Sequence, residues 1–146
     1  MRTSFDTTIN VLDGLLEFER ATGGSAAVRE ARRGGEEYLL ERSLFRRKST
    51  GEVVDQAYLH FAFPYYWHYD VLRALDYFRR AGAEPDPRMA EGVEVVRSKQ
   101  QPDGPWLLDR IHPGRVHFDL EPDVGMPSRW NTLRALRVLD WWNGDA

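Results

Sequence analysis

The sequence predicts an all-α fold built from repeated helical hairpins, with about five helices in one domain. A similar ten-residue pattern occurs three times, at 9–18, 69–78 and 130–139, and the copies are 60 and 61 residues apart. Each copy contains two leucines three positions apart, and a short polar residue precedes the first leucine by two positions: Asn10, Asp70 and Asn131. A fixed period of this length is typical of repeat proteins, in which each unit stacks on its neighbours. Neither long loop between the helices shows the alternation of a strand, so we expect no sheet.

The first hairpin is predicted from helix start and stop signals. Its first helix runs from Asp6, which we expect to be the N-cap, to Ala21, and it ends before two glycines. Ser25 caps a second helix that fades near Arg42 or Phe45. A connection of about 46–66 follows, and connections of this length are more often functional than idle.

The second half of the chain repeats this plan. A third helix is expected from Trp67 to Ala81, and a fourth begins after Asp86 as N-cap and runs to about Gln100. A second long loop covers about 107–127, and Ser128 caps the last helix. We therefore expect a single domain, 1–146, with repeats at 5–66 and 67–127 and a half repeat at 128–146.

Composition excludes several classes of protein. The net charge is −3 and the basic residues are scattered among acids, so no footprint for nucleic acid is visible. The chain has no cysteine, which excludes a disulfide framework and fits a cytoplasmic protein. There is no signal-peptide core and no apolar run of membrane-spanning length.

One turn carries a family resemblance. Gln100, Gly104 and Trp106, preceded by Gly92 and Val95, are similar to the QW repeat motif of squalene-hopene cyclases. In physical terms, the Gln amide can bond carbonyls left unpaired at a helix C-terminus, and the Trp ring can cover the turn. The stretches LFRRKSTGEV and PSRWNTLRALRVL also resemble the C-terminal half of uncharacterised bacterial members of this superfamily. The alternative is that the turn is only a solvent-exposed loop.

The resemblance implies an α/α toroid, with helices one, three and five on the inner wall and two and four on the outer wall. An earlier copy of the motif, near Gly35, has degenerated. Toroids of this superfamily close with more hairpins than this chain contains, so we expect a partial ring with exposed apolar ends. Three explanations stay open: the chain is part of a longer toroid, it forms a homo-oligomer, or its loops cap the ends.

The reactions of the family are not expected here. Class II terpene cyclases protonate their substrate with the middle acid of a DxDDTA motif, but Phe5 stands at the matching position, before Asp6. The zinc site of the related prenyltransferases requires a cysteine. The histidines show no metal-ligand spacing: His60, His68, His112 and His117. We therefore expect no metal and no cofactor, and the balance is against an enzyme.

An aromatic stretch, 61–70, is the best candidate for a ligand site because it leads into the start of the third helix. Aromatic faces suit an apolar, isoprenoid-like molecule or a cation. The equivalent stretch of the last repeat is 127–131, where Arg129 could bind a carboxylate or phosphate, or pair with Asp70 or Glu121. The alternative is that the rings are core and the polar residues are caps. The candidate ligand-binding residues are His60, Tyr65, Tyr66, Trp67, His68, Asp70, Arg129, Trp130 and Asn131.

Three functions are consistent with these features. The first is a diverged or noncatalytic toroid domain that binds an apolar, isoprenoid-like ligand. The second is a helical module for protein–protein interaction or self-assembly without a ligand. The third is a terpenoid-modifying enzyme with an unusual acid.

Overall fold

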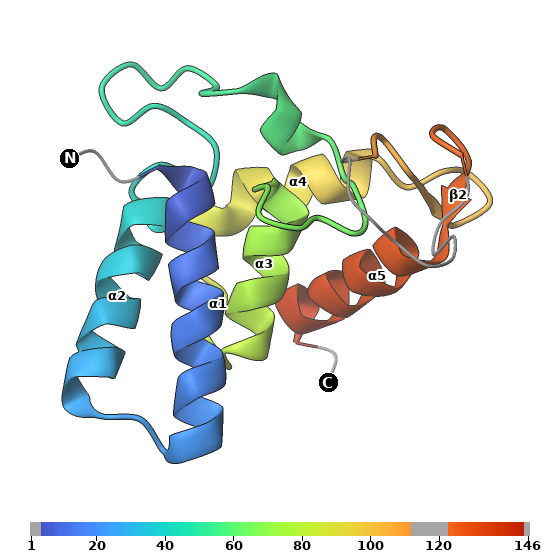
Figure 1. The fold of residues 1–146 in the computed structure, drawn as a ribbon. Coiled ribbons are helices and arrows are strands. Elements are labelled where there is room, and N and C mark those ends of the chain that lie inside the picture. Colours follow the sequence, from blue (N-terminus) through green and yellow to red (C-terminus); the bar gives the residue numbers. More distant parts are fainter. Residues whose placement is uncertain (1–3, 112–122, 145–146) are drawn as a thin grey trace.

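A computed structural model describes residues 4–111 and 123–144 and confirms the mostly helical prediction (Figure 1). Within these residues there are five α-helices: α1 (Phe5–Thr22), α2 (Ala26–Leu40), α3 (Val71–Arg80), α4 (Ala90–Ser98) and α5 (Arg129–Asn143). Two short 3-10 helices precede α3 and α4: η1 (Gln56–Leu59) and η2 (Pro87–Met89). None of the described helices combines the length and apolarity needed to cross a membrane.

A small sheet corrects the expectation that the loops contain no strand. Strand β1 (Trp106–Leu107) pairs antiparallel with β2 (Pro127–Ser128), with Trp106 opposite Ser128. Each strand has only two residues, which is too short for an alternating pattern to be visible in sequence. The pair ties the turn after α4 to the start of α5.

The helix caps agree with the sequence at two α-helices and correct it at three. Ser25 and Ser128 cap the helices predicted for them, whereas Asp86 caps the 3-10 helix η2, and α4 begins after Met89 without a side-chain cap. At α1 the N-cap is Ser4, whose hydroxyl accepts the Thr7 N–H at 3.0 Å. The third helix begins at Val71 rather than Trp67, because the Asp70 carboxylate caps it.

The carboxylate of Asp6, which we expected to cap α1, has a different role. It accepts the backbone N–H of Tyr69 at 2.8 Å and so fixes the segment before α3 against the start of α1. The neighbouring Phe5 is buried and packs its ring against Tyr38, Tyr58 and Tyr69, at centroid distances of 5.7, 5.2 and 5.1 Å.

The turn after α4 forms as expected, but the side chain that bonds a carbonyl of the helix is Trp106 and not Gln100. The Trp106 indole N–H donates to the Val96 carbonyl at 2.8 Å, and the ring is fully buried. The Gln100 amide instead donates to the Gly104 carbonyl at 3.0 Å, within the turn itself. The tryptophan is therefore the residue that satisfies a carbonyl in the last turn of α4.

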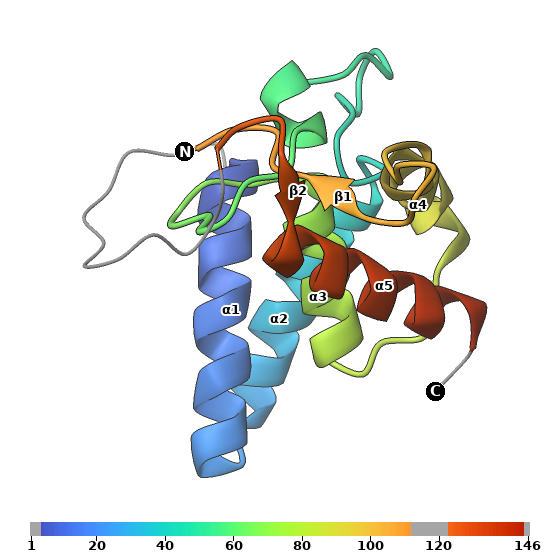
Figure 2. The ribbon, with the colours of Figure 1, turned by 90° about the vertical axis from the view of Figure 1, so that its right-hand side faces the viewer.

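The helices are arranged around α3. In Figure 1, α2 lies at one edge beside α1, α3 lies in the middle, α4 passes behind it, and α5 lies at the opposite edge. Figure 2 shows α5 crossing in front of α3. Every residue of α3 from Val71 to Phe78 is buried, so this helix forms the centre of the core.

Candidate ligand-binding site

Several of the candidate residues meet where the starts of α3 and α5 approach each other. Asn131, in the first turn of α5, is fully buried, and its amide donates to the carbonyls of Phe61 and Leu107 at 3.2 and 3.1 Å. The Asp109 carboxylate also accepts the Phe61 N–H at 2.8 Å. These bonds hold Phe61, the first residue of the aromatic stretch 61–70, against the first turn of α5.

Two arginines that the sequence did not single out lie at the centre of this region. Arg73 and Arg134 are 4% and 7% exposed, which is rare for arginine. Both guanidinium groups lie over the ring of Tyr65, at 4.3 and 5.3 Å from its centroid, where cation–π attraction holds them. We call Tyr65, Asp70, Arg73, Asn131 and Arg134 the arginine site.

The two arginines differ in how fully their donors are used. Arg73 donates to the His68 carbonyl at 2.9 Å and to the Asp13 carboxylate at 2.8 Å, which leaves only its Nε without an acceptor. Arg134 donates through Nη2 to Ala62 and Asn131, at 3.1 and 2.8 Å. Its Nε and Nη1 are buried and have no acceptor. Burying a cationic donor without a partner costs folding free energy. Arg134 can therefore donate hydrogen bonds to a further, anionic group.

Asp70 is a buried carboxylate that interacts with the charges of both arginines. Burial raises the pKa of Asp70, and the charges of Arg134 and Arg73 together with hydrogen bonds from the backbone of Arg73 and Ala62 oppose that rise. We expected Arg129 to be the possible partner of Asp70. The structure instead brings Arg134 to it, and Arg129 is exposed at the first position of α5.

Aromatic side chains surround the arginine site. The Phe63 ring lies 5.5 Å from the Arg134 guanidinium and stacks on Trp130, with the ring centroids 5.2 Å apart. Trp67 is 59% exposed and stacks on His68 at 3.8 Å. An apolar surface therefore lies beside the buried donors. The donors themselves are closed from solvent.

The remaining candidate residues are more peripheral. His60 is exposed and ends η1, and Tyr66 is an exposed residue with a φ of 48° in the loop before α3. No group of acidic and histidine side chains suited to a metal ion occurs in the described part of the chain. His112, His117 and Glu121 lie outside the described residues.

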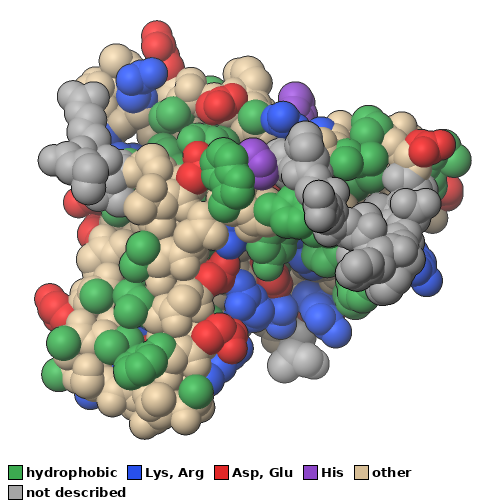
Figure 3. All heavy atoms as spheres, viewed as in Figure 1, with side chains coloured by type: hydrophobic (Ala, Val, Ile, Leu, Met, Phe, Trp, Pro, Cys, Tyr) green, Lys and Arg blue, Asp and Glu red, His purple; other side chains and the backbone are tan. Residues whose placement is uncertain are grey.

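A ladder of ion pairs continues from the arginine site along α1 and α3. Asp13 accepts hydrogen bonds from Arg73 and Arg80, both at 2.8 Å, and Asp76 pairs with Arg79 at 2.8 Å and with Arg80 at 3.3 Å. Figure 3 shows basic and acidic side chains next to one another on the face between α1 and α5. Each arginine of this ladder is paired with at least one carboxylate, whereas the Nε and Nη1 of Arg134 have no acceptor.

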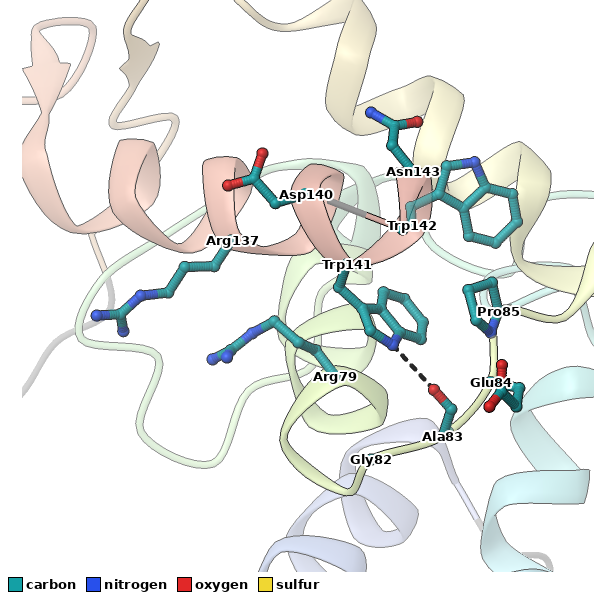
Figure 4. Close-up of a pocket in the computed structure, with 11 residues that line it drawn as sticks. Arg79, Gly82, Ala83, Glu84, Pro85, Arg137, Asp140, Trp141, Trp142 and Asn143 are labelled. Atoms are coloured by element: carbon teal, nitrogen blue, oxygen red, sulfur yellow. Dashed lines mark hydrogen bonds between the residues drawn. The ribbon is translucent and has the colours of Figure 1, made fainter. Parts of the chain in front are cut away.

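A hollow of 740 Å³ lies at the other end of α3 and α5, away from the arginine site (Figure 4). The Trp141 indole donates to the Ala83 carbonyl there at 2.9 Å, which joins α5 to the turn after α3. Glu84, Arg137 and Asp140 are exposed around it, so their charges are solvated. None of the candidate residues from the sequence lines this hollow, and its indole N–H already has a structural partner.

The signal that could have identified the two arginines is the repeat itself. Three positions after the polar residue of each copy stand Asp13, Arg73 and Arg134. These are charged residues on helices that are otherwise apolar at this point, and the structure pairs the first with the second.

No protein-family model, curated protein or solved structure matches this chain.

Proposed function

We propose that this chain is a diverged α/α-toroid-like domain of the squalene-hopene cyclase and prenyltransferase type, which binds an apolar, isoprenoid-like ligand without converting it. The ligand has an anionic end, a carboxylate or phosphate, that is bound by Arg134. The observation that carries the proposal is the pair of buried, unpartnered donors of Arg134 beside an aromatic surface.

The chemistry of the donors supports an anion. Arginine presents donors only, and its planar group matches the two oxygens of a carboxylate or phosphate. The free Nε and Nη1 of Arg134 lie on different edges of the guanidinium, because the Nε–H shares its edge with Nη2, which is already bonded, so each free donor offers a single hydrogen bond to an anion. Because Asp70 offsets much of the cation's charge, the site suits one anionic group rather than several.

The surroundings support an apolar body for the ligand. Phe63, Trp67 and Trp130 present aromatic surface near the arginine site, and the two tryptophans are partly exposed. Large aromatic side chains contribute much of the binding energy for apolar ligands through the area that they bury.

Binding without chemistry is favoured by the surroundings of α1. Phe5, at the position that matches the proton donor of the cyclases, is buried in a cluster of tyrosines, and the Asp6 carboxylate is bonded to a backbone N–H. Asp70, the buried acid of the site, caps α3.

The test compares farnesyl phosphate and farnesoic acid with the uncharged farnesol by isothermal titration calorimetry. Both anions should bind at least about tenfold more tightly than farnesol, because a hydrogen bond to a charged group is worth about 1.5–3 kcal/mol. In Arg134→Met this preference should disappear while farnesol binding is retained. Arg137→Met, an exposed arginine three positions further on α5, is the matched control and should keep the preference.

Circular dichroism establishes that both variants are folded. Equal affinity of the native chain for farnesol and the anions would contradict the anionic end of the ligand. Absence of binding for all three probes, together with a bare mass in native mass spectrometry of the freshly purified chain, would contradict the proposed function as a whole.

A further inference from the structure

One face of α5 carries exposed apolar side chains. Leu133 and Leu136 lie on it three positions apart and are 38% and 44% exposed. The leucines of α3 that occupy the same positions in the repeat, Leu72 and Leu75, are fully buried. The same sequence pattern is thus covered in one helix and open in the other.

The two hairpins show what covers a leucine at these positions. In the first hairpin, Leu12 of α1 lies against Gly35 of α2, so closely that a Cβ on this glycine would be 2.9 Å from Leu12 Cδ2. In the second, a Cβ on Gly92 of α4 would be 3.0 Å from Leu44 Cδ1 and 3.1 Å from Val71 Cγ1, with Leu75 Cδ1 at 3.8 Å. In both hairpins a glycine of the second helix allows close approach of apolar side chains, and in the first hairpin the closest of these is a leucine of the first helix. No described helix presents such a glycine to Leu133 or Leu136.

A complementary surface lies at the opposite edge of the molecule. A hollow of 360 Å³ between α1 and α2 is lined by uncharged residues: Thr7, Thr8, Val11, Leu12, Gly34, Gly35 and Tyr38. Val11 is 52% exposed, and a Cβ on Gly34 would meet no atom within 4 Å, so the glycine backbone is open to a partner. A cavity of about 150 Å³ already holds a benzene ring, so this hollow has room for leucine side chains.

We infer that a second copy of this chain covers the apolar face, with Leu133 and Leu136 of one copy inserted into the α1–α2 hollow of the next. The contact repeats between molecules the pairing of leucine with glycine that Leu12 and Gly35 make within the first hairpin. It goes beyond the proposed ligand binding and does not depend on it. Because α2 and α5 lie at opposite edges of the molecule (Figure 1), the contact joins two different surfaces and is head to tail. Such contacts generate closed rings or open filaments.

Two variants each disable one surface. Leu133→Gln with Leu136→Gln removes the apolar face of α5, and both positions are already partly exposed. Gly34→Gln fills the hollow, and the open space around this glycine lets the helix accept the side chain. Gly14→Gln is the matched control for the second variant, since its Cβ also meets no atom and it lies outside the hollow. Phe18→Gln, at an apolar residue that is 50% exposed, is the control for the first.

Masses are measured by analytical ultracentrifugation over a range of concentrations. The native chain and both controls should form oligomers, and each disabled variant should be monomeric alone. A mixture of the two disabled variants should form dimers with one copy of each and nothing larger, because only one intact pair of surfaces remains. A monomeric native chain overturns the inference. So does assembly of Gly34→Gln alone, which would indicate contact between two α5 helices.

Discussion

Asp70 carries a buried carboxylate with two roles at the start of α3. It caps the helix by accepting the Arg73 N–H at 2.7 Å, and it lies close enough to Arg134 to interact with its charge. Burial raises its pKa above the ordinary 3.8 despite these interactions. Between 3.8 and the raised pKa the folded chain therefore binds more protons than the unfolded chain, and this group's contribution to stability falls as the pH rises through that range.

The first prediction compares Asp70→Asn with the native chain. Asparagine caps a helix about as well as aspartate and does not ionise. The variant therefore keeps the cap but not the loss of stability that ionising the buried Asp70 carboxyl causes as the pH rises. Its stability relative to the native chain should be higher at pH 7 than below pH 3.8, as measured by urea unfolding at each pH. Asp70→Ala should be less stable at both, by about 1 kcal/mol from the lost cap alone. A difference between Asn and Asp that does not change with pH would contradict the raised pKa.

Two polar residues of the arginine site could be found from the sequence. The repeat identified Asp70 and Asn131 as equivalent positions, and in the structure both interact with Arg134, while Tyr65 lies against Arg73. Arg73 and Arg134 were missed because an arginine on a helix is usually exposed, and only the packing of three helices buries these two.

The turn that ends α4 is the element whose contacts can be tested most directly. Trp106→Phe keeps an aromatic ring but removes the indole N–H that donates to the Val96 carbonyl. That carbonyl keeps the Lys99 N–H at 3.2 Å, so the variant should be less stable by about 0.5–1.5 kcal/mol, the net contribution of one hydrogen bond. Gln100→Ala, whose hydrogen bond is exposed, should cost less than about 1 kcal/mol. Urea unfolding of both variants measures this, and a larger effect for Gln100 would contradict the role of Trp106 in bonding the helix carbonyl.

Element boundaries were predictable where one residue alone could cap the helix. Ser25 and Ser128 stand alone before their helices, so the local pattern was sufficient. Before α1, Ser4 and Asp6 both can cap, and the choice depends on Tyr69, whose N–H binds Asp6 from 63 residues away. A local pattern contains no information about a contact of this kind.

The whole molecule shows why equal sequence copies acquire different environments. The repeat predicts three similar helices, but α3 is covered on all sides whereas α5 lies at the edge. The place of a helix among the packed helices decides how far its side chains are buried, and that place is a property of the complete fold. The number of helices and their pairing into hairpins could therefore be predicted, while the exposure of Leu133 and Leu136 could not.

The spacing between α1 and α2 provides a final prediction from two adjacent glycines. Replacing a helical glycine by alanine normally stabilises by about 0.5–1 kcal/mol, and Gly34→Ala should show this gain because its Cβ would meet open space. Gly35→Ala has the same gain in helix propensity, but its Cβ would be 2.9 Å from the buried Leu12 side chain. Overpacking costs about 1–3 kcal/mol, so this variant should be less stable than the native chain by about 1 kcal/mol. Thermal unfolding of both variants, at concentrations where the chain is monomeric, should therefore shift the melting temperature in opposite directions. A shift in the same direction would mean that the two helices can move apart without loss, and that close contact between leucine and glycine does not set the spacing within the hairpins.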